Sequence, residues 1–84
     1  MKKIKVYITA AKWFDKVNGN TYHNAKITTE KGISFYSGYQ YGYGRQYLVS
    51  AKEAFNEIYP KCEMVVIGET EFFTLKKVLK NNLF

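Results

Sequence analysis

A nine-residue stretch, YQYGYGRQY at positions 39–47, concentrates side chains that can bind a phosphate-bearing ligand. It holds four tyrosines, two glycines and the only arginine of the chain. Glycine lets the backbone approach a bound group closely, tyrosine supplies rings and hydroxyl groups, and arginine pairs with phosphate. A helix that begins near Gln46 would add unpaired N–H groups beside Arg45. The contacts predicted here come from Tyr39, Tyr41, Tyr43, Gly44, Arg45 and Gln46.

The same stretch has two other interpretations. Its glycines can simply make the bend of a strand-to-helix crossover, with the tyrosines covering the edge of the core. Tyrosine and arginine are also preferred at the centre of protein–protein interfaces. The GxG spacing at 42–44 is too weak a motif to indicate a dinucleotide site. The residue types alone therefore leave phosphate binding, a protein interface and a plain crossover open.

Catalytic and metal-binding patterns are missing from the sequence. The chain has one histidine, one cysteine and one aspartate, His23, Cys62 and Asp15, and they are far apart. No HExxH, CxxC, GxSxG or Walker pattern occurs, so we expect neither an enzyme nor a metal or other cofactor. We interpret His23 as a hydrogen-bonded residue at a strand start and Cys62 as a buried thiol. Catalysis would require His23 in a pocket beside Asp15 or a tyrosine.

The charge of the chain favours an acidic partner. The formal net charge is +6 and the isoelectric point is near 9.4. Residues 1–52 hold nine basic and two acidic side chains, a net +7, whereas residues 53–84 hold four and five, a net −1. A lone cysteine excludes an internal disulfide and fits a reducing compartment, and no apolar run is long enough to span a membrane. We expect a cytoplasmic protein that binds nucleic acid, a nucleotide or an acidic protein surface.

An alternating pattern of apolar and polar residues predicts three antiparallel strands that carry several of these side chains. The strands cover residues 3–14, 21–29 and 33–38. Asn18-Gly19 predicts a two-residue type I′ turn between the first two strands, which would place Ala10 opposite Ile27. Gly32 is expected in the left-handed conformation of a three-residue loop before the third strand.

The predicted pairing gives the sheet an apolar inner face and a mixed outer face. The inner face carries Ile4, Val6, Ile8, Phe14, Ala25, Ile27, Ile33 and Phe35, and the outer face carries Lys3, Lys5, Tyr7, Trp13, Tyr22, Asn24, Lys26 and Tyr36. Lys12 falls on the inner set, so we expect it near an edge or a bulge. Aromatic rings placed between lysines are suited to bind single-stranded nucleic acid, because the rings stack on bases and the ammonium groups hold phosphates. Cross-strand pairs of tyrosine and lysine can also simply stabilise the sheet. Lys5, Lys26 and Tyr36 join the predicted ligand contacts.

Two helices are predicted around a further strand. The first covers 46–58 and lies across the inner face because its apolar residues keep helical spacing, although a capping-box match within it leaves a later start open. Residues 62–67 are predicted to form a buried strand, and Thr70 would cap a second helix, 71–81. We expect a single α+β domain over residues 1–84, with a three- or four-stranded antiparallel sheet, two helices and the order β-β-β-α-β-α.

NGNTYH at 18–23 and YGYGRQYL at 41–48 resemble a recurrent pattern in small proteins of tailed phages and mobile elements. The similarity covers roughly the first two thirds of the chain, and no activity is assigned to that group, so no functional residue is carried over. Arg45 departs from the pattern, where an acidic residue is common. The resemblance implies a phage accessory protein that acts in host takeover or anti-defence in the host cytoplasm. Such a protein would sequester a nucleotide signal or block a host protein.

GYGRQYLVSAKEAF at 42–55 follows the predicted strands and is similar to the approach into a helix in double-stranded-RNA-binding domains. The preceding helix and the lysine cluster of those domains have no counterpart here, so the similarity concerns fold more than function. The leading prediction is a non-catalytic protein that binds nucleic acid or a nucleotide. The alternative is a protein-interaction module that inhibits a host protein, and a homodimer through an exposed sheet edge is a further option.

Overall fold

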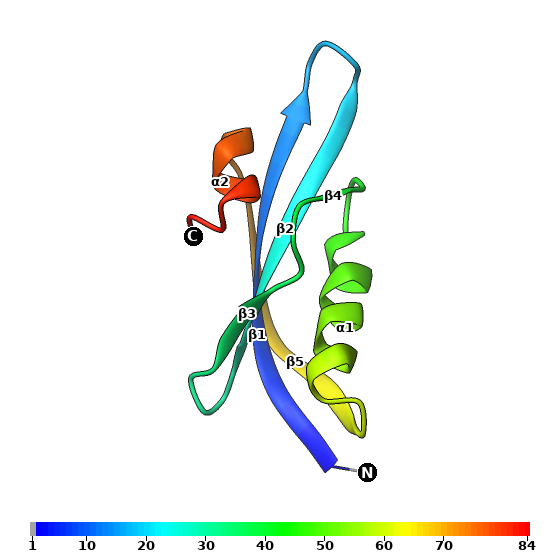
Figure 1. Cartoon of the computed structure of the whole chain (residues 1–84), viewed down its shortest axis with the longest axis vertical. Coiled ribbons are helices and arrows are strands. Elements are labelled where there is room, and N and C mark those ends of the chain that lie inside the picture. Colours follow the sequence, from blue (N-terminus) through cyan, green and yellow to red (C-terminus); the bar gives the residue numbers. More distant parts are fainter. Residues whose placement is uncertain (1) are drawn as a thin grey trace.

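The chain builds its sheet around strand β1 (Lys2–Asp15), which pairs with a neighbour on each side. β2 (Asn20–Thr29) runs antiparallel to β1, and β5 (Cys62–Phe73) runs parallel to it on the other side. The short strands β3 (Ser34–Tyr36) and β4 (Gln40–Tyr41) both pair with β2. The computed structural model, which describes residues 2–84, is therefore α+β with a mixed five-stranded sheet (Figure 1).

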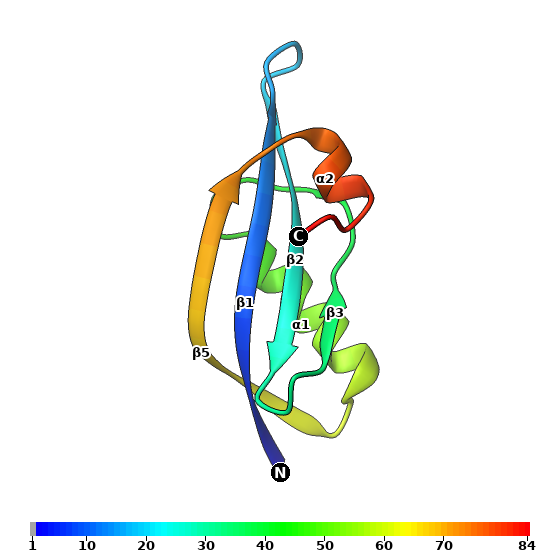
Figure 2. The same ribbon diagram turned by 90° about the vertical axis from the view of Figure 1, so that its left-hand side faces the viewer.

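The predicted antiparallel sheet of three or four strands was wrong in strand number and in the direction of β5. Helix α1 (Tyr47–Ile58) crosses one face of the sheet and returns the chain to the end where β1 begins (Figure 2). β5 therefore enters alongside β1 in the same direction, because a helical crossover is the usual route to a parallel strand. The two-residue strand β4 was not predicted either, and it interrupts the expected element order just before α1.

The two helices lie on opposite faces of the sheet, α1 on the inner face and the short helix α2 (Lys76–Lys80) on the outer face (Figure 1). The helix predicted at 46–58 is confirmed, with its first residue at Tyr47. Its apolar side buries the inner face of β1 and β2, which is what the alternation in these strands predicted. The buried core consists of Val6, Ile8, Ala10, Ala25, Ile27, Tyr47, Ala51 and Phe55.

The β1–β2 connection differs from the predicted two-residue turn. Ala10 lies opposite Ala25 rather than Ile27, a shift of two residues that leaves every side chain on its predicted face. The reason is Asp15, whose carboxylate accepts a hydrogen bond from the Val17 N–H at 3.0 Å and closes a longer loop. Gly19 takes a positive φ of 69° within that loop. The second hairpin is confirmed, with Ile27 opposite Phe35 and a positive φ at Gly32.

The second helix is much shorter than predicted, because β5 continues through the region expected to be helical. Thr70 does not cap a helix; its hydroxyl instead lies at hydrogen-bond distance from the Tyr7 hydroxyl on β1. Glu71 and Phe72 alternate between the two faces of the sheet, so pairing with β1 prevails over local helical spacing. In the part of the chain that the structure describes, no helix is long and apolar enough to cross a membrane.

Two residues predicted on the apolar inner face remain half exposed. Phe14 lies beyond the N-terminal end of α1 and is 45% exposed, and Ile33 follows the β2–β3 loop and is 52% exposed. β1 and β2 continue past the N-terminal end of α1 towards their turn, so α1 leaves this end of the inner face uncovered (Figure 1). Ile33 lies outside the strands, immediately before β3. These positions therefore contribute apolar surface at the two ends of the molecule.

Candidate functional site

Four aromatic side chains meet on the outer face of the sheet, near the β1–β2 turn. The ring of Tyr22 stacks on Trp13 with 5.7 Å between ring centroids and lies 5.1 Å from the ring of Tyr39. Tyr41 presents its edge to Tyr22 at 5.6 Å. The arrangement follows from pairing, since Trp13 and Tyr41 are both register partners of Tyr22 and partners share a face. We call Trp13, Tyr22, Tyr39 and Tyr41 the aromatic cluster.

Two lysines of α2 lie over this cluster. The Lys76 Nζ is 5.2 Å from the centroid of the Trp13 ring, and the Lys80 Nζ is 5.3 Å from that of Tyr39. Neither ammonium group has a carboxylate partner within residues 2–84. Burial, with a smaller contribution from Tyr22, raises the pKa of the Tyr39 hydroxyl, which is therefore neutral at physiological pH. The cluster thus combines aromatic surface with two ammonium groups that form no ion pair among the described residues, and the Asp15 carboxylate lies near Lys76 and Tyr39.

The segment that carries Tyr39 and Tyr41 is held against the sheet by a buried histidine. His23 Nδ1 lies 3.1 Å from the Gly42 carbonyl oxygen, and Nε2 lies 2.7 Å from Ser50 Oγ on α1. Ser50 Oγ is also 3.0 Å from Gln40 Oε1. Burial, and then the nearby Lys12 ammonium, lowers the pKa of His23 against the opposing effect of the Gly42 carbonyl. His23 is therefore neutral near pH 7 and links β2, the loop and α1.

Gly42 is required at this junction. A Cβ atom there would lie 2.6 Å from Gln46 Cγ and 2.9 Å from His23 Cε1, closer than real Cβ contacts come. Its N–H donates to the Thr21 carbonyl oxygen at 3.0 Å, which continues the pairing of β4 with β2. The glycine thus brings the loop into contact with the histidine ring, while Tyr41 before it lies on the outer face.

A second polar cluster lies on the inner face around Lys12, which the sequence predicted near an edge or a bulge. Lys12 is on the central strand β1, away from the register shift between Val6 and Tyr7, and only 4% exposed, so that prediction was wrong. Its Nζ donates to Glu71 at 3.1 Å and lies 5.4 Å from the centroid of the Tyr47 ring. The hydroxyl of Tyr47 donates to Glu71 at 2.9 Å and to Glu69 at 3.2 Å. Burial and these carboxylates raise the pKa of Tyr47 to about 12.

Arg45 belongs to this inner cluster rather than to the aromatic cluster. Its guanidinium group pairs with the carboxylate of Glu69 on β5. The side chain nevertheless stays 65% exposed, so the pairing leaves one side of the guanidinium open to solvent. No sequence pattern predicted this pair, because the strand predicted at residues 62–67 ended before Glu69.

The start of α1 offers fewer unpaired N–H groups than the sequence prediction assumed. The Gln46 N–H donates to the Tyr43 carbonyl oxygen at 3.2 Å, and those of Leu48 and Val49 donate to carbonyl oxygens of Arg45 and Gln46 at 3.0 Å. A tight turn before the helix thus uses donors that a ligand could otherwise reach. Gln46 has helical dihedral angles and its side chain makes no capping bond.

The predicted contact residues are distributed over three places. Tyr39 and Tyr41 are in the aromatic cluster, while Tyr43, 75% exposed, and Gly44 lie at the loop surface near Arg45 and Gln46. Lys5, Lys26 and Tyr36 are further along the outer face, and the Tyr36 hydroxyl donates to the Phe84 carbonyl oxygen. The structure brings in four residues that the site prediction omitted: Trp13, Tyr22, Lys76 and Lys80.

Comparisons with family models, with curated proteins and with solved structures found no match to this chain. Among the described residues, no group of three or more His, Cys, Asp or Glu side chains could hold a metal ion. The geometry of the aromatic cluster is therefore the main guide to function.

Proposed function

We propose that this protein is a small, basic, non-catalytic binding protein that recognises nucleic acid or a nucleotide. The observation that supports this function is the aromatic cluster with Lys76 and Lys80 beside its rings. Bases stack on such rings, each contributing about 1–3 kcal/mol, while ammonium groups attract the phosphates that follow each base. Tyr41, 61% exposed, offers the most accessible ring.

The exposed loop next to the cluster extends this proposed site. The loop continues from Tyr41 towards the inner cluster. A ligand that extends beyond the aromatic cluster can therefore place a phosphate group or a further base against Tyr43 and the exposed part of Arg45, with Gly44 allowing close approach of the backbone. Lys5 and Lys26 are separated from the cluster by α2 and the segment ending at Phe84. Only a ligand of several nucleotides would reach both regions, so the length dependence of binding distinguishes a strand from a mononucleotide.

The resemblance to small proteins of tailed phages and mobile elements supports a role as an accessory protein in the host cytoplasm. In that setting a nucleic-acid or nucleotide binder would act by sequestering its ligand. The proposal requires no reaction at His23, because its ring is buried and both nitrogens lie at hydrogen-bond distance from protein atoms.

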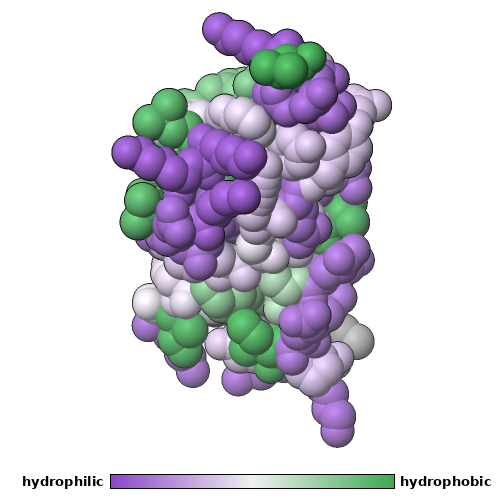
Figure 3. Space-filling model, turned by 45° about the horizontal axis from the view of Figure 1, so that its top comes forward, coloured by the Kyte–Doolittle hydropathy of each residue, from purple (hydrophilic) through white to green (hydrophobic). Residues whose placement is uncertain are grey.

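A protein partner is the second candidate function, and exposed apolar side chains near the β1–β2 turn favour it. Phe14, Val17, Phe73 and Leu75 are 45%, 92%, 66% and 60% exposed. A docking surface for an inhibited host protein would need such residues to form a continuous area. In the view of this end of the molecule, the strongly apolar surface occurs as separate patches among polar side chains (Figure 3). The nucleic-acid proposal therefore has the better support.

Fluorescence anisotropy with labelled single-stranded DNA and RNA of increasing length tests the proposed function. We expect binding that weakens steeply with salt, because several phosphates are contacted. Tyr41→Ala and Lys80→Gln should weaken binding, whereas Lys61→Gln, at the opposite end of the molecule, should not. Absence of binding to every length, or equal binding by Tyr41→Ala and the wild type, would overturn the proposal.

A further inference from the structure

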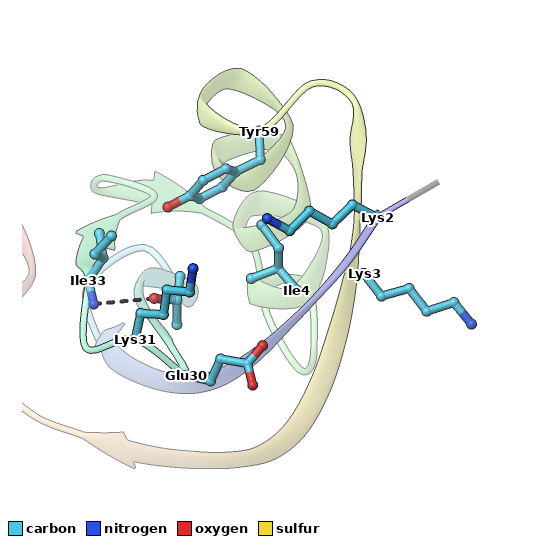
Figure 4. A pocket seen from close by; sticks show the side chains of 8 residues that line it. Lys2, Lys3, Ile4, Glu30, Lys31, Ile33 and Tyr59 are labelled. Carbon is cyan, nitrogen blue, oxygen red and sulfur yellow. Dashed lines mark hydrogen bonds between the residues drawn. The ribbon is translucent and has the colours of Figure 1, made fainter.

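A hollow of about 190 Å³ opens at the other end of the molecule from the aromatic cluster. It lies between the beginning of β1, the β2–β3 loop and the end of α1 (Figure 4). The residues that matter for its chemistry are Lys2, Ile4, Glu30, Lys31, Ile33 and Tyr59. None of them belongs to the aromatic cluster, so the hollow is independent of the function proposed above.

The walls of the hollow are apolar and well supported. The Tyr59 ring packs against Phe55 with 5.2 Å between centroids and against Phe35 at 6.3 Å, which fixes it as one wall. Ile4 and Ile33 complete the apolar surface, and the half exposure of Ile33 leaves its side chain accessible from the hollow. A ligand that covers this branched apolar side chain removes it from water, which favours binding.

Positive charge surrounds this apolar surface. The ammonium groups of Lys2 and Lys31 extend over the hollow, whereas that of Lys3 points away from it (Figure 4). Lys3 lies 3.9 Å from the carboxylate of Glu63, but Lys2 and Lys31 have no such partner among residues 2–84. Glu30 contributes one carboxylate to the lining, so the two lysines leave a net positive charge.

Apolar walls beside unpaired ammonium groups suit a ligand with two different ends. We propose that the hollow binds a small amphiphilic anion, with its carboxylate or phosphate group between Lys2 and Lys31 and its apolar chain or ring on Ile4, Ile33 and Tyr59. The Tyr59 hydroxyl makes no side-chain hydrogen bond within the described chain, and it can donate to the same anionic group. An anion without an apolar part would leave the walls uncovered and bind more weakly.

NMR titration of the isotopically labelled protein tests this site, because amide shifts locate even weak binding. The probes are octanoate, phenyl phosphate and inorganic phosphate, added separately to the whole chain. We expect octanoate and phenyl phosphate to shift the amides of Lys31, Ile33 and Tyr59, and inorganic phosphate to bind at least tenfold more weakly. Equal affinity for inorganic phosphate, or shifts spread over all surface lysines, would overturn the proposal.

Charge variants make the test specific, and none of them replaces a buried residue. Lys31→Gln should weaken binding of both amphiphiles by about threefold, the effect of one exposed ion pair, and Glu30→Gln should strengthen it by about twofold. Lys16→Gln, an exposed lysine in the β1–β2 turn, is the matched control and should leave affinity unchanged. An equal loss in Lys31→Gln and Lys16→Gln would show general charge attraction and overturn the site. Nucleic-acid binding should persist in Lys31→Gln, which separates this test from that of the aromatic cluster.

Discussion

The Nζ atom of Lys12 lies 3.1 Å from Oε1 of Glu71, with 5% of the lysine side chain and 46% of the glutamate side chain exposed. The two ends of this ion pair thus face different surroundings. The lysine cannot regain water if its partner is lost, whereas the glutamate can. The stability of the sheet should therefore respond unequally to removal of either partner.

We predict that Glu71→Gln lowers the free energy of unfolding by about 2 kcal/mol, because it leaves the Lys12 charge buried and weakly paired. Lys12→Met keeps the volume and leaves only a half-exposed carboxylate, so its cost should be within about 1 kcal/mol. Urea unfolding followed by circular dichroism measures both changes. Equal losses in the two variants would contradict the asymmetry.

The only histidine of the chain should make stability depend on pH between neutral and mildly acidic conditions. Burial lowers the pKa of His23 in the folded protein, while the unfolded chain binds a proton near the ordinary value of 6.5. The contribution of His23 to the free energy of unfolding is therefore fully present above pH 6.5. It decreases as the pH falls from 6.5 towards the pKa of His23 in the folded protein. Urea unfolding at pH 7.5 and about pH 5.5 should show this decrease. His23→Gln should be less stable at neutral pH and should lack the dependence.

Gly42→Ala should destabilise the protein by about 2 kcal/mol, because its Cβ would collide with the His23 ring and the Gln46 side chain. Gly44→Ala is the matched control in the same loop. Its φ of 60° is strained for alanine, but open space surrounds the added atom, so about 1 kcal/mol is expected. Thermal unfolding of the two variants checks the order, and an equal or larger loss for Gly44→Ala would refute the close approach at Gly42.

Tyr47 should ionise only at strongly alkaline pH, since its pKa is raised to about 12. An alkaline titration followed by tyrosinate absorbance should show a late step that is missing in Tyr47→Phe. The same variant removes the donor to Glu69 and Glu71, at an expected cost of about 1 kcal/mol. A late step that survives in Tyr47→Phe would assign it to another ring.

Much of the fold was predictable because alternating side chains decide which face of a strand is buried. The Ile27–Phe35 pairing and helix α1 followed from such patterns. The first turn was not predictable in this way, because the Asp15 side chain stabilises a longer loop than the two-residue turn that Asn18-Gly19 alone favours. The residues after Thr70 match helical spacing as well as strand alternation, and only pairing with β1 decides between them.

The candidate site was predictable in part for the same reason. Tyr39 and Tyr41 stood out by their density in one stretch, and the structure places both in the aromatic cluster. Lys76 and Lys80 reach that cluster only because β5 extends to Phe73 and positions α2 on the outer face. Their contribution depends on a long-range pairing that local sequence patterns do not reveal.

Strand β1 runs the length of the molecule and contributes Ile4 to the hollow at one end and Trp13 to the aromatic cluster at the other. Trp13 is nine positions after Ile4 in the sequence, which in an extended strand separates the two residues by about 30 Å. A hydrogen-bonded neighbour on each side stiffens β1 along most of that distance. Ligands held at the two ends of this strand would therefore keep a constant spacing. Fluorophores attached to those ligands would report a single, narrowly distributed energy-transfer distance.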